Sequence, residues 1–244
     1  MRRLRIVSAT RESRDTFKRT RLLGTSMHRL LFDARITSSI SCHNALGLPT
    51  VYNRAIKEAD DDDALLFVHD DVFIHDFNLA HRIEEALAAF DVVGLAGNIN
   101  PSANHVGWAM WRDQGNNLKL EEGRLLSGIV GHFTAGGEVI CQYGPVPQRC
   151  ELLDGCFLAA PARLLRERGI WFDERFQFHF YDLDFCRTCL LKGLRLGTWP
   201  IAVTHGSGGA YGSPQWEAAL KIYQEKWPIP TGSPGLPMNQ DPSV

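Results

Sequence analysis

The chain has 244 residues, of which 44% are hydrophobic and 22% are charged, and this balance excludes a disordered or a fibrous protein. Its 26 Lys and Arg residues nearly balance its 28 Asp and Glu residues, so the net charge of −2 lacks the basic excess of nucleic-acid-binding proteins. At roughly 150 residues per domain, the length favours one domain, and we expect no nucleic-acid partner.

The sequence predicts a cytoplasmic protein. No apolar run approaches the roughly 20 residues needed to cross a bilayer, so we expect no transmembrane segment. The N-terminus lacks the apolar region and cleavage site of a signal peptide, and the six cysteines are expected to be free thiols. Basic residues cluster within residues 2–21. A solvated surface is the simpler interpretation of this cluster, and peripheral binding at the inner membrane face is the alternative.

The first hundred residues alternate between strand-like and helix-like segments. Runs of β-branched or continuously apolar residues predict strands, and apolar side chains at helical spacing predict helices. The predicted strands are residues 5–10, 34–41, 64–68 and 92–96, and the predicted helices are residues 50–59 and 78–90. Strands that alternate with helices in this way favour a parallel sheet with helices on its faces.

The second half is less regular. Its predicted elements are, in chain order, a polar loop or surface hairpin at 111–124, a strand at 153–160, a helix between Pro161 and Gly169, a helix at 182–191, a strand at 200–204 and a glycine-rich loop at 205–209. Five prolines after Trp227 predict an irregular tail over residues 228–244.

Three polar residues, His69, Asp70 and Asp71, follow the apolar strand predicted at 64–68. Ligands of open α/β sheets bind outside the carboxyl ends of the strands. Two adjacent carboxylates at such a place repel each other unless a cation or a donor-rich ligand compensates them. The structural alternative is a turn in which one aspartate caps the backbone.

A second acidic segment, residues 178–185, combines aromatic residues with Asp182 and Asp184 at an expected helix start. The helix dipole favours anions there, and one aspartate could simply be the N-cap. Capping explains one carboxylate and leaves the other as a candidate functional group.

His205 follows the last predicted strand and precedes a glycine-rich loop. An imidazole at this place can bind a metal ion, and the backbone amides after it can reach a phosphate. An ordinary loop histidine is the alternative. The sequence contains no GxxxxGK[ST], GxGxxG or GxSxG motif, so it lacks the usual nucleotide-binding loops and the esterase elbow.

In this order the segments resemble GT-A-type family 2 glycosyltransferases, and most closely the branch typified by a streptomycin-biosynthesis glycosyltransferase-like protein. The matching stretches are NALGLPTVYN at 44–53, LLFVHDDV at 65–72, DVVGLAG at 91–97, LLDGCFLA at 152–159, FDERF at 172–176, FHFYDLDFC at 178–186, VTHGSGG at 203–209 and KW at 226–227. The resemblance implies one α/β domain of the GT-A (Rossmann-like) type over residues 1–227, with a mostly parallel central sheet and helices on both faces. It further implies a nucleotide-binding half at about 1–100, an acceptor half at about 101–227, and then the tail.

The resemblance also implies roles for individual residues. Asp71 and His205 would bind a divalent metal, Mn²⁺ or Mg²⁺, and Asp182 would be the catalytic base, with Asp184 as the alternative base. The implied donor-binding residues are Ser8, Thr10, Arg11, Asn44, Asn53, His69 and Asp70. The implied acceptor-side residues are Asp154, His179, Tyr181 and Asp184, and Trp108 and Trp111 would help to shape the acceptor cleft. Tyr181 stands where the family commonly has Glu.

These roles predict a metal-dependent, inverting, hexosyltransferase-like enzyme. It would move a sugar from a nucleotide-diphosphate donor to a hydroxyl of a glycan, a lipid-linked acceptor or a small molecule. Two alternatives stay open: a metal-dependent hydrolase that uses the same His and Asp residues, and a non-catalytic carbohydrate-binding protein on the same fold.

Overall fold

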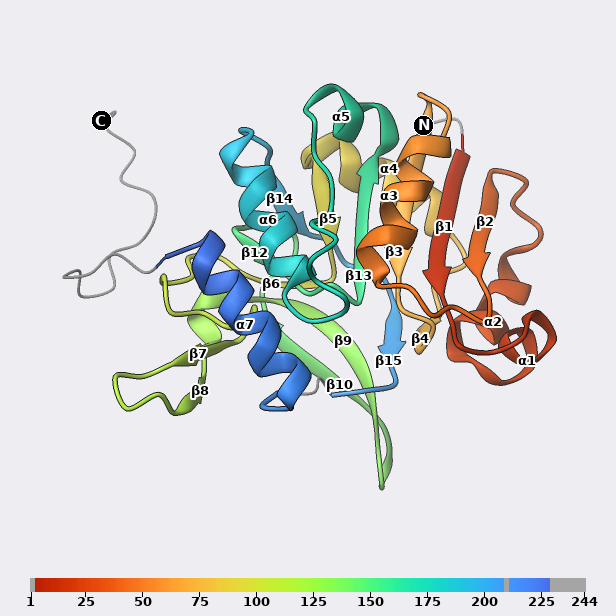
Figure 1. Ribbon diagram of the computed structural model, residues 1–244. Helices are drawn as coiled ribbons and strands as arrows, with labels where there is room; N and C mark the ends of the chain where they lie inside the picture. The colour runs from red at the N-terminus through yellow and green to blue at the C-terminus, as the bar shows by residue number, and fades with distance from the viewer. Residues whose placement is uncertain (1–2, 209–210, 229–244) are drawn as a thin grey trace.

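The structure is a computed structural model that describes residues 3–208 and 211–228 (Figure 1). The helices are α1 (Arg14–Thr20), α2 (Leu22–Met27), α3 (Leu48–Glu58), α4 (Leu79–Ala89), α5 (Ala162–Glu167), α6 (Tyr181–Leu191) and α7 (Pro214–Lys226), with short 3-10 helices η1 (His28–Leu30) and η2 (Gly123–Leu125). Within the described ranges, no helix combines the length and the apolar composition that crossing a membrane requires.

The main sheet contains seven strands in the described part of the chain. Their spatial order is β11 (Gln148–Cys150), β14 (Leu196–Thr198), β5 (Val92–Gly94), β13 (Phe157–Pro161), β3 (Asp63–Val68), β1 (Arg3–Ala9) and β2 (Ile36–Ser41). Five strands run the same way, whereas β13 and the edge strand β11 run antiparallel to their neighbours. The predicted mostly parallel sheet is confirmed.

Helices cover both faces of this sheet, as predicted. Side chains alternate along β3, so that Leu65 and Phe67 point into one hydrophobic core while Leu66 and Val68 point into the other. The first core is completed by α3, α5, α6 and α7, and the second by α1, α2 and α4. Figure 1 shows α3 and α5 in front of the sheet and α4 behind it.

A second sheet continues from the main one. Its order is β12 (Leu152–Leu153), β6 (Ala96–Asn98), β9 (Leu126–Thr134), β15 (Val203–His205) and β4 (Val72–Ile74), and β10 (Gly137–Gly144) pairs with β9. The strands predicted at 92–96 and 153–160 are therefore each two strands. The chain passes from one sheet to the other between Gly94 and Ala96, and again between Leu153 and Phe157. Strand propensity does not reveal such a change of sheet, because both halves are apolar.

The structure confirms some of the other predicted elements and changes the bounds of others. The polar segment at 111–124 forms a hairpin of β7 (Met110–Arg112) and β8 (Leu118–Leu120), as one of the two predicted alternatives, while the last strand begins at Val203 and not at Pro200. The helices α1, α2 and α7 and the long β9–β10 hairpin were not predicted. Gly209 of the predicted glycine-rich loop and residues 229–244 of the predicted tail lie outside the described residues.

Candidate active site

A cavity of about 540 Å³ brings together six of the candidate residues from distant parts of the sequence. It is lined by His69 after β3, Asp154 between β12 and β13, Asp182 at the start of α6 and His205 at the end of β15. Aromatic side chains from the loops and from α7 complete its wall. The cavity therefore lies where the two sheets meet, at the carboxyl end of β3, as expected for an open α/β sheet.

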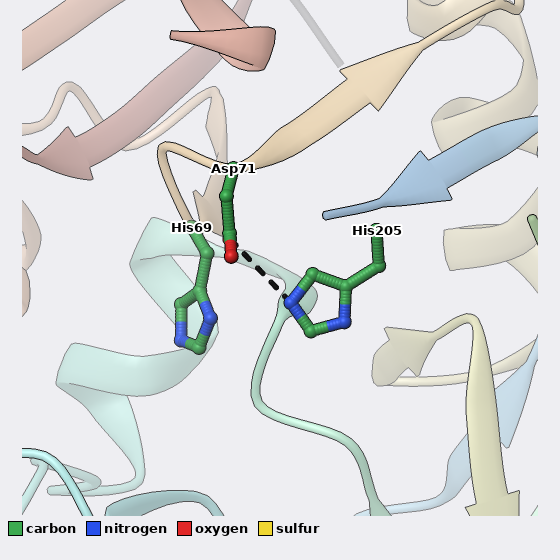
Figure 2. Close-up of side chains that lie close together, drawn as sticks. All are labelled: His69, Asp71 and His205. Carbon is green, nitrogen blue, oxygen red and sulfur yellow. Dashed lines mark ion pairs between the residues drawn. The ribbon is translucent and has the colours of Figure 1, made fainter. Parts of the chain in front are cut away.

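His69, Asp71 and His205 form a cluster whose potential metal-ligand atoms all lie within 4.8 Å of one another (Figure 2). The turn between β3 and β4 holds the first two residues. Antiparallel pairing of β15 with β4 places His205 opposite Val72, and the Gly206 amide donates to the Asp71 carbonyl at 2.8 Å. Backbone pairing thus holds the third ligand beside the first two.

Asp71 fits a cation ligand. Its Oδ1 atom is buried, receives no hydrogen bond from the described residues, and lies 3.4 Å from Nε2 of His205. Burial alone would raise the pKa of Asp71, but the neighbouring His205, Ser207 and His69 lower it well below its usual value. Burial conversely lowers the pKa of His205, and Asp71 and Asp154 raise it overall. The cluster therefore contains an ionised carboxylate with an unsatisfied oxygen, which is a suitable ligand for Mn²⁺ or Mg²⁺.

The hydrogen bonds of Tyr181 fix the tautomer of His69. The Tyr181 hydroxyl donates its proton to the Gly155 carbonyl at 2.8 Å, so its 2.8 Å contact with Nε2 of His69 requires the imidazole to donate. The lone pair then resides on Nδ1. Figure 2 shows this nitrogen, the one bonded to Cγ, on the side of the ring that faces Asp71 and His205. A metal-binding histidine is normally held in this way through its other nitrogen.

Asp182 lies in the cavity wall in the first turn of α6. Burial raises its pKa from 3.8 to about 7, and the nearby Asp154 contributes in the same direction, although Gly155 N donates to Oδ2 at 3.0 Å. The close approach of Tyr181 and Asp182 to the backbone of residue 155 requires glycine there. A Cβ atom at 155 would lie 2.6 Å from the Tyr181 hydroxyl oxygen and 2.7 Å from Cβ of Asp182. A carboxylate with a pKa near neutrality is suited to general-base catalysis.

Phe180, immediately before α6, has a left-handed backbone with a φ of 65°. A bulky residue rarely adopts this conformation, and such strain clusters at functional sites. The strained residue starts the helix that carries Tyr181 and Asp182, so it helps to set the direction of both side chains.

Asp184 does not line the cavity. Its fully buried carboxylate pairs with Nζ of Lys226 at 2.8 Å and accepts a hydrogen bond from Nε1 of Trp227 at 2.8 Å. It therefore ties α6 to the end of α7. Of the two candidate bases, Asp182 alone faces the cavity among the described residues.

Several predicted donor-binding residues have structural partners instead of facing the cavity. Both oxygens of Asp70 accept hydrogen bonds from Arg21, at 2.9 and 2.8 Å, which attaches the α1–α2 segment to the end of β3. The amide of Asn53 bonds to the backbone of Phe172 and to Glu174, and thereby joins α3 to the loop before α6.

The remaining donor-side candidates lie around the carboxyl end of β1 and outside the cavity lining. Ser8 and Thr10 are buried, Arg11 is exposed, and Asn44 donates its backbone amide to the Thr10 carbonyl at 2.9 Å. The Ser8 hydroxyl is buried and has no hydrogen-bond partner among the described residues. These residues form a second group, separate from the cavity lining.

The predicted acceptor-side residues Asp154, His179 and Tyr181 all line the cavity, as does Trp108, whereas Trp111 does not. Sequence reasoning missed five other lining residues: His132, Tyr143, Phe178, Tyr211 and Trp216. Parallel pairing of β15 with β9 places His132 opposite His205, and Tyr143 reaches His132 from β10. His132 and Tyr143 lie outside the matching stretches, so only strand pairing could have located them, whereas Phe178 begins the matching stretch at 178–186.

No protein-family model matches the sequence, and no curated protein matches it. Solved structures are similar to it. GalNAc-T7, solved with UDP, GalNAc and Mn²⁺, superimposes on 92% of this chain with a TM-score of 0.52 at 11% identity. The chain has a GT-A-type fold. Also similar are residues 1–349 of TarS from S. aureus (TM-score 0.49, 14% identity, 84% of this chain) and A197 from STIV (0.47, 14%, 80%).

The chain spans 60% of the length of the TarS fragment, 81% of that of A197 and 48% of that of GalNAc-T7. At these identities the likeness establishes the fold and leaves the activity to be argued from the site.

Proposed function

We propose that the protein is a metal-dependent glycosyltransferase of the inverting, family 2 type, which transfers a sugar, expected to be a hexose, from a nucleotide diphosphate to an acceptor hydroxyl. One observation carries the proposal: in a GT-A-type fold, a His–Asp–His cluster and a buried aspartate with a raised pKa lie at the same cavity. GalNAc-T7, which shares the fold, was solved with a nucleotide, a sugar and Mn²⁺, the types of ligand proposed here.

His69, Asp71 and His205 would hold a divalent cation, which we expect to be Mn²⁺ or Mg²⁺. When bound, the cation would neutralise the charge that develops on the leaving diphosphate. The role of His69 thereby changes from donor binding, as first expected, to metal binding, because its free Nδ1 faces the other two ligands (Figure 2).

Asp182 would accept the proton of the attacking acceptor hydroxyl, as a general base in direct reach of the cavity. A single displacement of this kind inverts the anomeric centre. Asp184 is excluded from this role in the proposal, because Lys226 and Trp227 occupy its carboxylate.

The nucleotide would bind in the first half of the chain, at the group around the carboxyl end of β1 that contains Ser8, Thr10, Arg11 and Asn44. The unpartnered Ser8 hydroxyl supports this placement, since a buried polar group without a partner costs free energy. The acceptor would bind beside Asp182, among residues of the second half of the chain.

The test is a turnover assay with UDP-, GDP- and dTDP-sugars and Mn²⁺, with and without a panel of glycoside acceptors. We expect release of nucleoside diphosphate that requires the metal and is stimulated by an acceptor, and a product of inverted anomeric configuration by NMR. Asp182→Asn should lower kcat by about 10²- to 10⁴-fold, the usual contribution of a general base. Asp62→Asn, at an exposed aspartate before β3, makes the same change of charge far from the cavity and should leave kcat unchanged.

Other results would point elsewhere. Metal-dependent cleavage of phosphoesters without any effect of an acceptor would indicate a hydrolase. Sugar binding that neither a chelator nor Asp182→Asn alters, with no turnover of any donor, would indicate a non-catalytic carbohydrate-binding protein. Either outcome would overturn the proposal.

A further inference from the structure

The wall of the cavity is largely aromatic. Seven aromatic side chains line it, namely Trp108, Tyr143, Phe178, Phe180, Tyr181, Tyr211 and Trp216. Trp108 packs edge-on against Tyr143, with ring centroids 4.9 Å apart, and Phe178 stacks on His69 at 5.5 Å. These contacts hold the rings in fixed orientations. Fixed aromatic surfaces with a few polar groups are typical of small-molecule sites and provide faces on which the apolar side of a sugar ring can pack.

Two aspartates, Asp154 and Asp182, supply hydrogen-bond acceptors in the cavity. Asp154 accepts the Cys156 amide through Oδ1, and its Oδ2 receives no hydrogen bond from the described residues. Asp182 likewise has one oxygen, Oδ2, bonded to the Gly155 amide. Carboxylate oxygens accept hydrogen bonds from hydroxyls, so the two aspartates suit a polyhydroxylated ligand.

Histidines are the basic side chains in the described lining of the cavity. No lysine or arginine is among its lining residues within the described ranges, and residues 209–210 and 229–244 contain neither type. His179 also lines the cavity, and burial lowers the pKa of its imidazole. A phosphate or carboxylate placed beside Asp154 and Asp182 would lose its hydration and face two carboxyl groups, with no lysine or arginine of the lining to pair with.

We infer that the acceptor is an uncharged sugar, and that acceptors bearing a phosphate or a carboxylate are rejected at the cavity wall. The inference rests on the proposed function, because it takes the ligand that reaches Asp182 to be the acceptor. The pKa of Asp182 supports it, since Asp154 already disfavours a second negative charge at this place.

The test compares matched sugar pairs by ligand-observed NMR and titration calorimetry on the whole protein. The neutral probes are methyl glucoside, methyl galactoside and methyl mannoside, and each is paired with the corresponding 6-phosphate. We expect at least one neutral sugar to bind about tenfold or more tightly than its phosphate, because like charges in a binding site cost 1 kcal/mol or more.

Two variants sharpen the test. Leu120→Arg adds a cation at the exposed rim of the cavity on β8, and should lower the preference for the neutral sugar about fivefold or more. Leu118→Arg adds the same charge on the same strand outside the cavity lining, and should leave the preference as it is.

Three results would overturn the inference: a 6-phosphate that binds as tightly as its neutral partner, no binding of any neutral sugar at its solubility limit, or an equal response of the two arginine variants. None of these results concerns nucleotide turnover. The release of nucleoside diphosphate, measured separately, therefore distinguishes a wrong acceptor class from a wrong proposed function.

Discussion

At the scale of single residues, Tyr181 decides which nitrogen of His69 is free. Its hydroxyl donates to the Gly155 carbonyl and accepts from Nε2 of His69, and both contacts measure 2.8 Å. The resemblance noted from the sequence places Tyr181 where that family commonly has Glu. A tyrosine keeps a neutral acceptor for the imidazole proton and adds no further negative charge beside Asp154 and Asp182.

Tyr181→Phe removes that hydrogen bond, so both His69 tautomers become accessible. We expect Mn²⁺ affinity to fall about 10- to 100-fold, the usual loss when the partner of a metal-binding histidine is removed. Mn²⁺ binding is followed by electron paramagnetic resonance. Tyr143→Phe is the matched control, because its hydroxyl contacts His132, which is outside the cluster.

Unchanged Mn²⁺ affinity in Tyr181→Phe would contradict the assignment. So would ¹⁵N NMR of the unsubstituted, metal-free protein if it found the proton of His69 on Nδ1, and this second readout does not depend on how well the variant folds.

The proposed role of Asp182 predicts a pH dependence of the sugar transfer. Burial and the nearby Asp154 raise its pKa to about 7, so the carboxylate needed as a base forms only as the pH rises through that value. We expect kcat/KM for sugar transfer to rise with pH through a transition near 7. The folded state also holds this proton more tightly than the unfolded state, whose aspartate titrates near 3.9. The free energy of unfolding should therefore contain a term that decreases between about pH 4 and pH 7.

Both effects can be measured on the unsubstituted protein and on the Asp182→Asn variant. Steady-state kinetics gives the pH profile, and urea unfolding at several pH values gives the stability. Asp182→Asn should remove the stability term as well as the activity. A kinetic transition near pH 4 would contradict the raised pKa of Asp182, because it would mean that the carboxylate is ionised throughout the neutral range.

At the scale of secondary-structure elements, an element could be predicted where its own residues show the hydrophobic pattern of a helix or a strand. Helix α4 was predicted because Leu79, Ile83 and Ala86 recur on one buried face, and β3 was predicted because residues 64–68 are all apolar and buried. Helix α1 was missed. It has seven residues and buries only Phe17, so its basic residues dominate the pattern.

The site was partly predictable for the same reason. His69, Asp71 and His205 each follow a predicted strand, and strand ends are where ligands bind in such sheets. By contrast, Asp182 and Asp184 are two residues apart in one helix turn, and sequence alone could not separate them. The difference comes from the end of α7, because Lys226 and Trp227, about forty residues away, bond to Asp184 and not to Asp182.

At the scale of the whole molecule, the candidate site is built from residues that lie far apart in the sequence. The His69–Asp71–His205 cluster links residues 69–71 with residue 205, and the cavity adds residues 106–110, 132, 143 and 154 between them. His69 directly follows β3 of the main sheet, and His132, Tyr143 and His205 belong to the second sheet. Asp182 and Trp216, at the starts of α6 and α7, also line the cavity. A ligand that fills the site therefore bridges the two sheets, and unfolding of either sheet would require its release.

That bridging makes thermal stability a test of ligand binding. A ligand present at about 100 times its Kd stabilises the folded state by about 2.7 kcal/mol. For a chain of this size that corresponds to a rise in Tm of about 5 to 10 °C.

We expect UDP or another nucleoside diphosphate together with Mn²⁺ to produce such a rise in differential scanning fluorimetry. EDTA should abolish it, because the nucleotide would then lack the cation that joins its phosphates to Asp71. Asp71→Ala should eliminate the rise while Asp62→Asn retains it. A nucleotide-dependent rise that persists in EDTA, or in Asp71→Ala, would contradict the placement of the metal between β4 and β15.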